Sequence, residues 1–242
     1  MSPPPACDIE ALADDVWLLR FGDRIDPDLN AAVHAMAARL RASNPSWLRD
    51  LVPAFASLGV FFDATVDPAR VHAQLLALVE AGASDGPLSM PARKEAENGV
   101  VEIPVLYGGE HGPDLESSAA ELGLSPDELI RRHAAGDYTV AMIGFAPGFP
   151  YLSGLDPALA LPRLATPRAR VEAGSVAIGG AQTGIYPRES PGGWRLLGRT
   201  PWALFDATRE LPSRLQPGDR VRFVAIDADG FDRLAAQQDA SS

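Results

Sequence analysis

The N-terminal third of the chain alternates short apolar runs with apolar positions at helical spacing. Residues 16–21 form an apolar run typical of a strand, and apolar side chains then recur at helical spacing over residues 29–40. The runs 51–55 and 60–62 predict two further strands, and Asp67 before a proline predicts the start of a second helix. The order strand, helix, strand, strand, helix predicts a small split-βαβ, ferredoxin-like α/β domain.

The periodic pattern then lapses into glycine, serine, proline and charged residues, which is typical of a linker between domains. We therefore expect a small α/β domain over residues 1–85, a linker over 86–99 and a second domain over 100–242. His34 and His72 fall in the N-terminal helices, and we expect a structural role for both.

The second domain begins with a predicted strand at residues 100–106, followed by two helical segments at 114–122 and 125–135. Ser125, a proline and Glu128 predict a capping box for the second of these helices. Short predicted strands then alternate with turn residues, which favours a closed or nearly closed antiparallel β-barrel and an α+β fold class. These strands are expected at residues 138–143, 175–178, 194–197 and 220–224.

Composition and charge exclude several classes of function. A net charge of -11 argues against a nucleic-acid partner, because such binding requires a basic face. Cys7 is the only cysteine, so neither an intramolecular disulfide nor a cysteine-based zinc site is possible. No apolar stretch approaches the roughly 20 residues that span a bilayer, and we expect no secretory signal in the first ten residues. We expect a cytoplasmic protein that does not bind membranes.

Glycine concentrates in the second domain, where 15 of the 22 glycines lie between residues 107 and 201. Four clusters of glycine, proline and polar or aromatic residues stand out there. They read YGGEHGPD (107–114), GFAPGFPY (144–151), PR with TPR (162–168), and QTGIYP running into SPGGW (182–194).

These clusters, in this order and followed by GRTP (198–201), resemble the family of KipI and the 5-oxoprolinase B subunit (PxpB), also called allophanate hydrolase subunit 1. The resemblance covers residues 102–223 and implies a cyclophilin-like antiparallel barrel behind a small α/β domain. It also implies a non-autonomous part of an ATP-dependent 5-oxoprolinase, which opens 5-oxo-L-proline to L-glutamate. The implied partners are a tightly bound C subunit, in a heteromer, and an A subunit. ATP, with Mg, would be bound by the complex.

Two other functions remain open on the same residues. The KipI branch of the family implies an inhibitor that binds a sensor histidine kinase, and the shared clusters do not separate it from the enzyme component. Prolyl isomerase activity would rest on fold analogy alone, and a fold does not determine a function.

Arginines form a basic island in this acidic chain. Six arginines lie between residues 161 and 199 against two acids, Glu172 and Glu189. Guanidinium groups bind carboxylates and phosphates in a forked geometry, so we expect Arg163, Arg168 and Arg199 to bind an anion. Removal of Arg168 is expected to weaken binding more than folding. The alternative is that these arginines are solvated or paired with acids elsewhere in the chain.

A carboxylate beside an imidazole in a glycine-rich loop can position water or move a proton, so Glu110 and His111 are the candidate catalytic residues. Asp114 is expected to cap a helix instead. No phosphate-binding loop, dinucleotide fingerprint or zinc-protease motif is present, and we expect no metal site.

The remaining candidate residues complete a predicted ligand pocket. We expect Gln182, Thr183 and Tyr186 to orient polar atoms of the substrate. Aromatic and rigid residues of the clusters would form the pocket wall, although turn formation and core packing alone also explain them. The predicted wall residues are Tyr107, Phe145, Pro147, Phe149 and Trp194.

Overall fold

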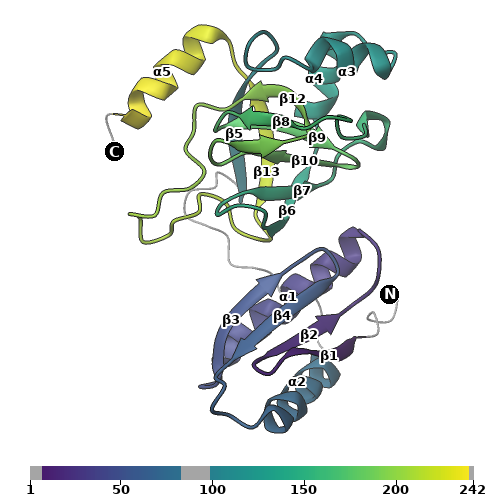
Figure 1. Ribbon diagram of the computed structural model, residues 1–242, viewed down its shortest axis with the longest axis vertical. Helices are drawn as coiled ribbons and strands as arrows, with labels where there is room; N and C mark the ends of the chain where they lie inside the picture. The colour runs from purple at the N-terminus through teal and green to yellow at the C-terminus, as the bar shows by residue number, and fades with distance from the viewer. Residues whose placement is uncertain (1–6, 83–98, 240–242) are drawn as a thin grey trace. The chain divides into compact units, whose positions relative to one another are not determined.

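The computed structural model describes residues 7–82 and 99–239, and the chain divides into two compact units (Figure 1). The first unit is Met1–Pro91 and the second is Ala92–Ser242. Because residues 86–98 of the predicted linker lie outside the described residues, the predicted domain boundaries stay a proposal.

The N-terminal unit is a four-stranded antiparallel sheet in the order β1-β2-β4-β3, with two helices. The predicted order along the chain, namely strand, helix, two strands and helix, is present from β2 onward. In the sheet, strand β4 lies between β2 and β3. Strand β1, which pairs with β2 at the sheet edge, was not predicted from the sequence. The elements are β1 (Asp8–Ala13), β2 (Val16–Arg20), α1 (Pro27–Ser43), β3 (Leu48–Pro53), β4 (Ser57–Phe62) and α2 (Pro68–Gly82).

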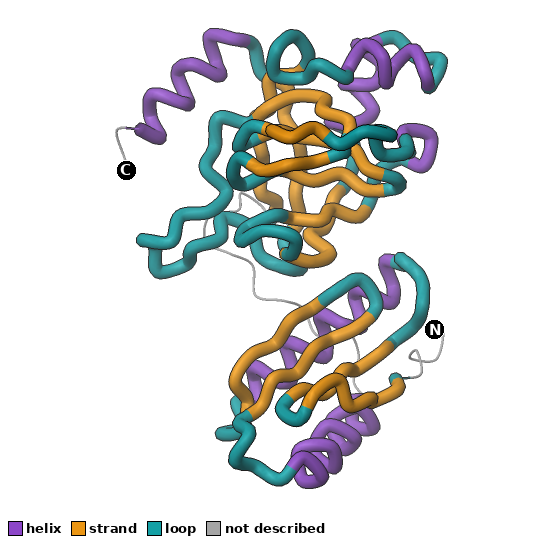
Figure 2. Tube along the Cα trace, viewed as in Figure 1, coloured by secondary structure: helices purple, strands orange, loops and turns teal. Residues whose placement is uncertain are grey.

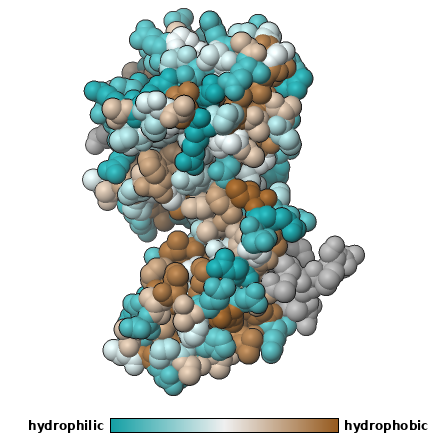
Figure 3. All heavy atoms as spheres, turned by 45° about the vertical axis from the view of Figure 1, so that its right-hand side comes forward, coloured by the Kyte–Doolittle hydropathy of each residue, from teal (hydrophilic) through white to brown (hydrophobic). Residues whose placement is uncertain are grey.

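Both helices of this unit pack against the same hydrophobic core as the sheet. Leu19, Leu58 and Leu75 contribute fully buried side chains from β2, β4 and α2. Asp26 begins α1, since its carboxylate accepts the N–H groups of Asp28 and Leu29. Hydrophobic side chains also appear on the visible surface of this unit, mixed with hydrophilic ones (Figure 3).

Cys7 packs against this core, next to strand β1. Burial raises the pKa of its thiol to about 11.

The second unit is a closed barrel of seven strands in the order β10-β7-β6-β13-β5-β12-β9, with helices and loops around it (Figures 1 and 2). Six neighbouring pairs are antiparallel, whereas β13 and β5 run parallel. The expected closed barrel is therefore present, but it is not purely antiparallel. Strands β8 and β11 form a separate two-stranded ribbon.

The elements of this unit match the expected strands and helices in large part. Ser125 begins α4 by accepting the N–H of Glu128, while the Glu128 carboxylate binds Arg131 and Arg132, so only half of the predicted capping box forms. The strands are β5 (Val100–Tyr107), β6 (Tyr138–Ile143), β7 (Pro150–Ser153), β8 (Arg168–Val171), β9 (Ser175–Gly179), β10 (Gln182–Ile185), β11 (Ser190–Gly192), β12 (Arg195–Arg199) and β13 (Arg220–Ala225). The helices are α3 (Leu115–Glu121), α4 (Pro126–Ala134), the short 3₁₀ helix η1 (Pro157–Leu159) and α5 (Ala228–Asp239).

Side chains of the barrel strands alternate between two hydrophobic clusters. Val176 and Ile178 of β9 belong to the main core, as does Leu197 of β12. Their neighbours Ala177 and Leu196 belong to a second cluster, because successive residues of a strand point to opposite faces. Val171 of β8 packs in this second cluster, so the β8–β11 ribbon covers part of the barrel's outer face.

A chain of polar side chains crosses the main core. The Tyr107 hydroxyl lies 2.8 Å from Nδ1 of His133, and Nε2 of His133 lies 2.9 Å from the Thr183 hydroxyl. The Thr183 hydroxyl donates to the carbonyl of Ala177, so it accepts from Nε2–H of His133, and Tyr107 donates to Nδ1. Burial lowers the pKa of His133 to about 3 and keeps the ring neutral. The network joins α4 to three strands and agrees with a structural role for His133.

Within residues 7–82 and 99–239, no helix is long and apolar enough to cross a membrane.

Candidate anion-binding pocket

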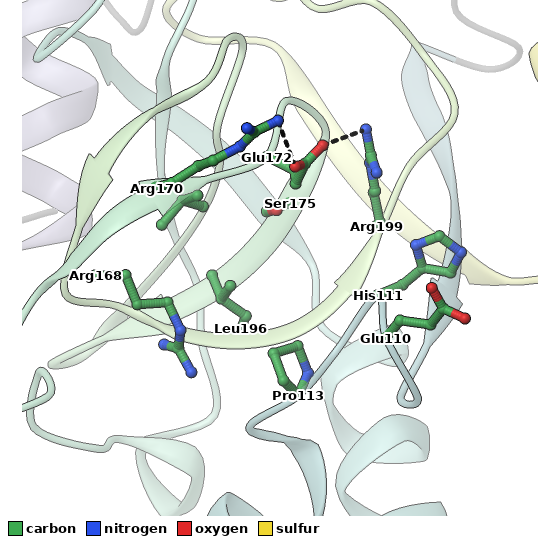
Figure 4. Close-up of a pocket in the computed structure, with 10 residues that line it drawn as sticks. Glu110, His111, Pro113, Arg168, Arg170, Glu172, Ser175, Leu196 and Arg199 are labelled. Atoms are coloured by element: carbon green, nitrogen blue, oxygen red, sulfur yellow. Dashed lines mark ion pairs between the residues drawn. The ribbon is translucent and has the colours of Figure 1, made fainter.

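A pocket of about 180 Å³ opens between the loop after β5, strands β8 and β12, and the turn that leads from β8 into β9. Figure 4 shows side chains from these segments around it. The lining residues are Glu110, His111, Pro113, Arg168, Arg170, Val171, Glu172, Ser175, Leu196 and Arg199.

The loop after β5 is tied to β12 by its backbone. The N–H groups of Gly108 and Asp114 donate to the carbonyls of Leu197 and Leu196, each over 3.0 Å. Gly112 lies so close to the Leu197 carbonyl that a Cβ at this position would collide with it. These contacts fix the loop that carries Glu110 and His111 to the pocket.

The Asp114 carboxylate anchors Arg168. It accepts from Nη2 of Arg168 over 2.7 Å and from the backbone N–H of Leu196 over 2.7 Å. Asp114 stands at the N-cap position of α3 but makes no side-chain cap bond, so its predicted role as a helix cap is wrong. The Arg168 side chain therefore contacts the fold as well as the pocket, and its removal is expected to affect folding too.

The other end of the Arg168 guanidinium carries an unsatisfied donor. Nη1 of Arg168 is buried and has no hydrogen-bond partner among the described residues. A buried donor without a partner carries a desolvation penalty, so an acceptor atom of a ligand or a water would stabilise this guanidinium.

Glu172 joins the other two arginines of the pocket. Its carboxylate lies 3.1 Å from Arg170 and 3.5 Å from Arg199, and Arg199 also donates from Nε to the Ala173 carbonyl over 2.8 Å (Figure 4). Arg170 pairs with Glu189 as well. The three arginines of the pocket thus face carboxylates on either side, and the local charge is close to balanced.

Elsewhere in the basic island, Arg195 pairs with Glu121 at 2.8 Å. Together with the ion pairs of Arg168, Arg170 and Arg199, this means that most arginines of the island have acidic partners. The expected excess of positive charge is therefore largely neutralised in the folded protein, in agreement with the alternative explanation of the island.

The candidate catalytic residues lie at the rim of this pocket. Glu110 is exposed, and the His111 ring stacks on Phe231 of α5 with 4.8 Å between ring centroids. Arg168 and Arg199 line the same pocket, so four of the predicted site residues come together.

A second group of predicted residues forms an aromatic cluster on the outer face of the barrel. Phe149, Tyr186 and Trp194 pack there, with the Phe149 ring 5.2 Å from Tyr186 and 5.6 Å from Trp194 between centroids. The Arg163 guanidinium lies 5.7 Å from the Trp194 ring centroid. The three rings share a hydrophobic cluster with two residues that line the pocket, so they lie behind the pocket and do not line it.

Phe145 and Pro147 lie in the loop before β7 and are exposed. Phe145 is 63% exposed and has a φ of 64°, an unusual conformation for a bulky residue. Backbone strain of this kind is often found at functional sites.

The three remaining residues lie on barrel strands outside the pocket. Tyr107 and Thr183 belong to the polar chain through His133, and burial raises the pKa of Tyr107 well above its ordinary value. Gln182 is buried, and its Nε2 has no partner among the described residues.

The other six lining residues, among them Arg170, Glu172 and Ser175, were not predicted as site residues from the sequence. The spacing of Arg168, Arg170 and Glu172 was an available signal, because residues two apart on a strand share a face. In the part of the chain that the structure describes, no group of three or more His, Cys, Asp or Glu residues is arranged to hold a metal ion.

Fold and pocket together define a protein with a small α/β unit and a closed barrel that bears an arginine- and glutamate-lined pocket. The chain belongs to the family described as carboxyltransferase domain, subdomain C and D, whose model matches residues 7–215.

Curated relatives support the family assignment. The chain is 42% identical over 225 residues to the 5-oxoprolinase B subunit of Bacillus subtilis (strain 168), covering 90% of this chain and 92% of that protein. It is 53% identical over 130 residues to the 5-oxoprolinase B subunit of Escherichia coli O157:H7, covering 54% of this chain and 60% of that one. The resemblance to this 5-oxoprolinase family is confirmed.

Among solved structures, the crystal structure of TTHA0988 matches with a TM-score of 0.74 and 41% identity, over 88% of this chain. The match spans 40% of the TTHA0988 chain, so that relative contains a large additional segment.

Proposed function

We propose that this chain is the B subunit of a multi-subunit, ATP-dependent 5-oxoprolinase, which converts 5-oxo-L-proline to L-glutamate. The observation that carries the proposal is the 42% identity that extends over 92% of the Bacillus subtilis relative. The alternative, an inhibitor of a sensor histidine kinase, is not favoured, because the curated relatives are named as subunits of the enzyme.

The pocket suits one part of this chemistry. Its volume of about 180 Å³ is below the range of roughly 300 to 1,000 Å³ for pockets that bind drug-sized ligands. The pocket therefore suits a smaller ligand, such as the compact anion 5-oxoproline. In the proposal, Arg168 and Arg199 bind the substrate carboxylate or the negative charge that develops during ring opening. Their ion pairs with Asp114 and Glu172 orient both guanidinium groups in advance.

Glu110 and His111 have the proton-transfer role in this proposal. Both lie at the rim, where water reaches them, and both are carried by the loop that is hydrogen-bonded to β12. An imidazole and a carboxylate are both able to accept a proton from water.

ATP supplies activation of the lactam, because an amide is a poor electrophile. The pocket of about 180 Å³ does not fit Mg–ATP, since its volume is too small for a nucleotide and the described residues provide no group of metal ligands. In the proposal, ATP and Mg are bound by the assembled complex.

The partners in this proposal are a tightly bound C subunit, in a heteromer, and an A subunit, in the cytoplasm. The exposed, strained Phe145 on the aromatic face suits a partner-covered surface. We also propose that the barrel is cyclophilin-like and the N-terminal unit ferredoxin-like. A closed barrel and the position of β4 between β2 and β3 support these descriptions.

The test is affinity purification of the tagged chain from its native extract, followed by an assay of ATP-dependent glutamate formation from 5-oxoproline. We expect the eluate to contain a larger sister protein and to be active. Arg168→Gln should lower kcat/KM by about tenfold, as for loss of a charge-assisted contact, whereas Arg220→Gln on β13 should not change it. Recovery of the chain alone, without activity, would contradict the proposal.

A further inference from the structure

A second pocket, of about 350 Å³, lies between helix α5 and the segment that follows β12. Its walls are mainly apolar. Trp202, Pro201 and Pro187 contribute from the barrel side, and Phe231 and Ala235 contribute from α5. The two α5 residues are four apart, so they lie on the same face of the helix. Pockets of this size and apolar character bind small organic molecules.

Arg199 is the one charged residue among the described residues that line this pocket. Its Nε is held by the Ala173 carbonyl, and its Nη2 lies 3.5 Å from Glu172, beyond the usual hydrogen-bond distance. The guanidinium is therefore fixed in direction and still able to donate. Glu172, the ion-pair partner of Arg199, does not line this pocket, so an anionic ligand there would compete with Glu172 for the guanidinium, whereas a cation would meet no carboxylate in the described lining.

Trp202 provides a rigid aromatic wall. The Arg214 guanidinium lies over its ring at 4.5 Å from the centroid, and Nε of Arg214 donates to the carbonyl of the next residue, Ala203. Phe231 is likewise held by its stacking on His111. Two fixed rings beside one fixed guanidinium match a ligand with a planar apolar part and a single negative charge.

We propose that this pocket binds a small aromatic carboxylate, with its ring against Trp202 and Phe231 and its carboxylate on Arg199. The site goes beyond the proposed 5-oxoprolinase function, because 5-oxoproline has no aromatic part and the proposed chemistry does not use Trp202. Arg199 also lines the first pocket, so occupation of the second pocket engages an arginine that the two sites share.

The test is isothermal titration calorimetry of the full chain with indole-3-acetate as the probe and neutral indole-3-acetamide as its matched control. We expect the acid to bind at least tenfold more tightly than the amide, because the charge-assisted contact with Arg199 is lost in the amide. Arg199→Gln should remove this preference, and Arg220→Gln, a surface arginine on β13, should leave it intact.

Ala235→Leu provides an independent test, since the added side chain on α5 would occupy the pocket and abolish binding of both probes. Circular dichroism and a thermal melt will establish whether each variant is folded. If Arg199→Gln does not fold, the binding of both probes to Ala235→Leu tests the proposal. The proposal is overturned by absence of binding at millimolar indole-3-acetate, by equal affinity for acid and amide, or by undiminished binding to folded Ala235→Leu. None of these measurements depends on 5-oxoproline turnover, so they fail or succeed separately from the proposed function.

Discussion

Removal of Arg168 should destabilise the barrel unit, because it leaves the Asp114 carboxylate without its charged partner. The Asp114 side chain is 10% exposed and that of Arg168 is 30% exposed. Loss of one member of a fully buried ion pair costs about 3 to 5 kcal/mol. Partial exposure of Arg168 and the remaining bond from the Leu196 N–H reduce this cost, so we expect about 2 kcal/mol for Arg168→Ala.

Urea denaturation followed by tryptophan fluorescence measures this loss. A decrease of about 2 kcal/mol corresponds to a fall in Tm of roughly 4 to 8 °C for a unit of this size. Arg220→Ala is the matched control, since Arg220 is 58% exposed and its partner Asp137 is 76% exposed, and an exposed pair contributes little. A double-mutant cycle with Asp114→Asn should give a coupling free energy of about 1 to 2 kcal/mol. Equal stability of the Arg168 and Arg220 variants would refute the anchoring role of Asp114.

Two further predictions concern ionisable groups away from the pocket. Burial lowers the pKa of His133 to about 3 from its ordinary 6.5, so below pH 6.5 the unfolded chain takes up a proton that the folded chain does not. This residue should reduce the free energy of unfolding by about 2 kcal/mol between pH 7 and pH 5, and protonation of His133 above pH 5 in an NMR titration of the folded protein would contradict it. Burial raises the pKa of Cys7 to about 11, so iodoacetamide at pH 8 should label the native chain at least tenfold more slowly than the urea-unfolded chain; equal rates would show that the thiol is not buried.

Local signals predicted much of the fold. The cap at Ser125 and the apolar runs of β6, β9, β12 and β13 are encoded by neighbouring residues, and the structure contains them. Strands β7 and β10 were missed because they are four residues long and lie within glycine- and proline-containing clusters. Their strand conformation depends on pairing within a closed barrel, which no local pattern reports.

The site was predicted only in part, because its residues meet through tertiary contacts. The clusters marked Glu110, His111, Arg168 and Arg199, and the structure brings these four to one pocket. The same clusters could not distinguish residues that line the pocket from residues that pack behind it, such as Trp194. Nor could they show which acids neutralise the arginines, since Asp114 and Arg168 are 54 residues apart.

We propose that this chain is one part of a larger enzyme and cannot open 5-oxoproline by itself. The most direct measurement is the rate of glutamate formation from 5-oxoproline and ATP by the purified chain alone and after addition of the purified C and A subunits. We predict no turnover by the chain alone and turnover only in the reconstituted mixture, with loss of that turnover when this chain is omitted. Turnover by the isolated chain at the rate of the mixture, or an undiminished rate without the chain, would contradict this proposal.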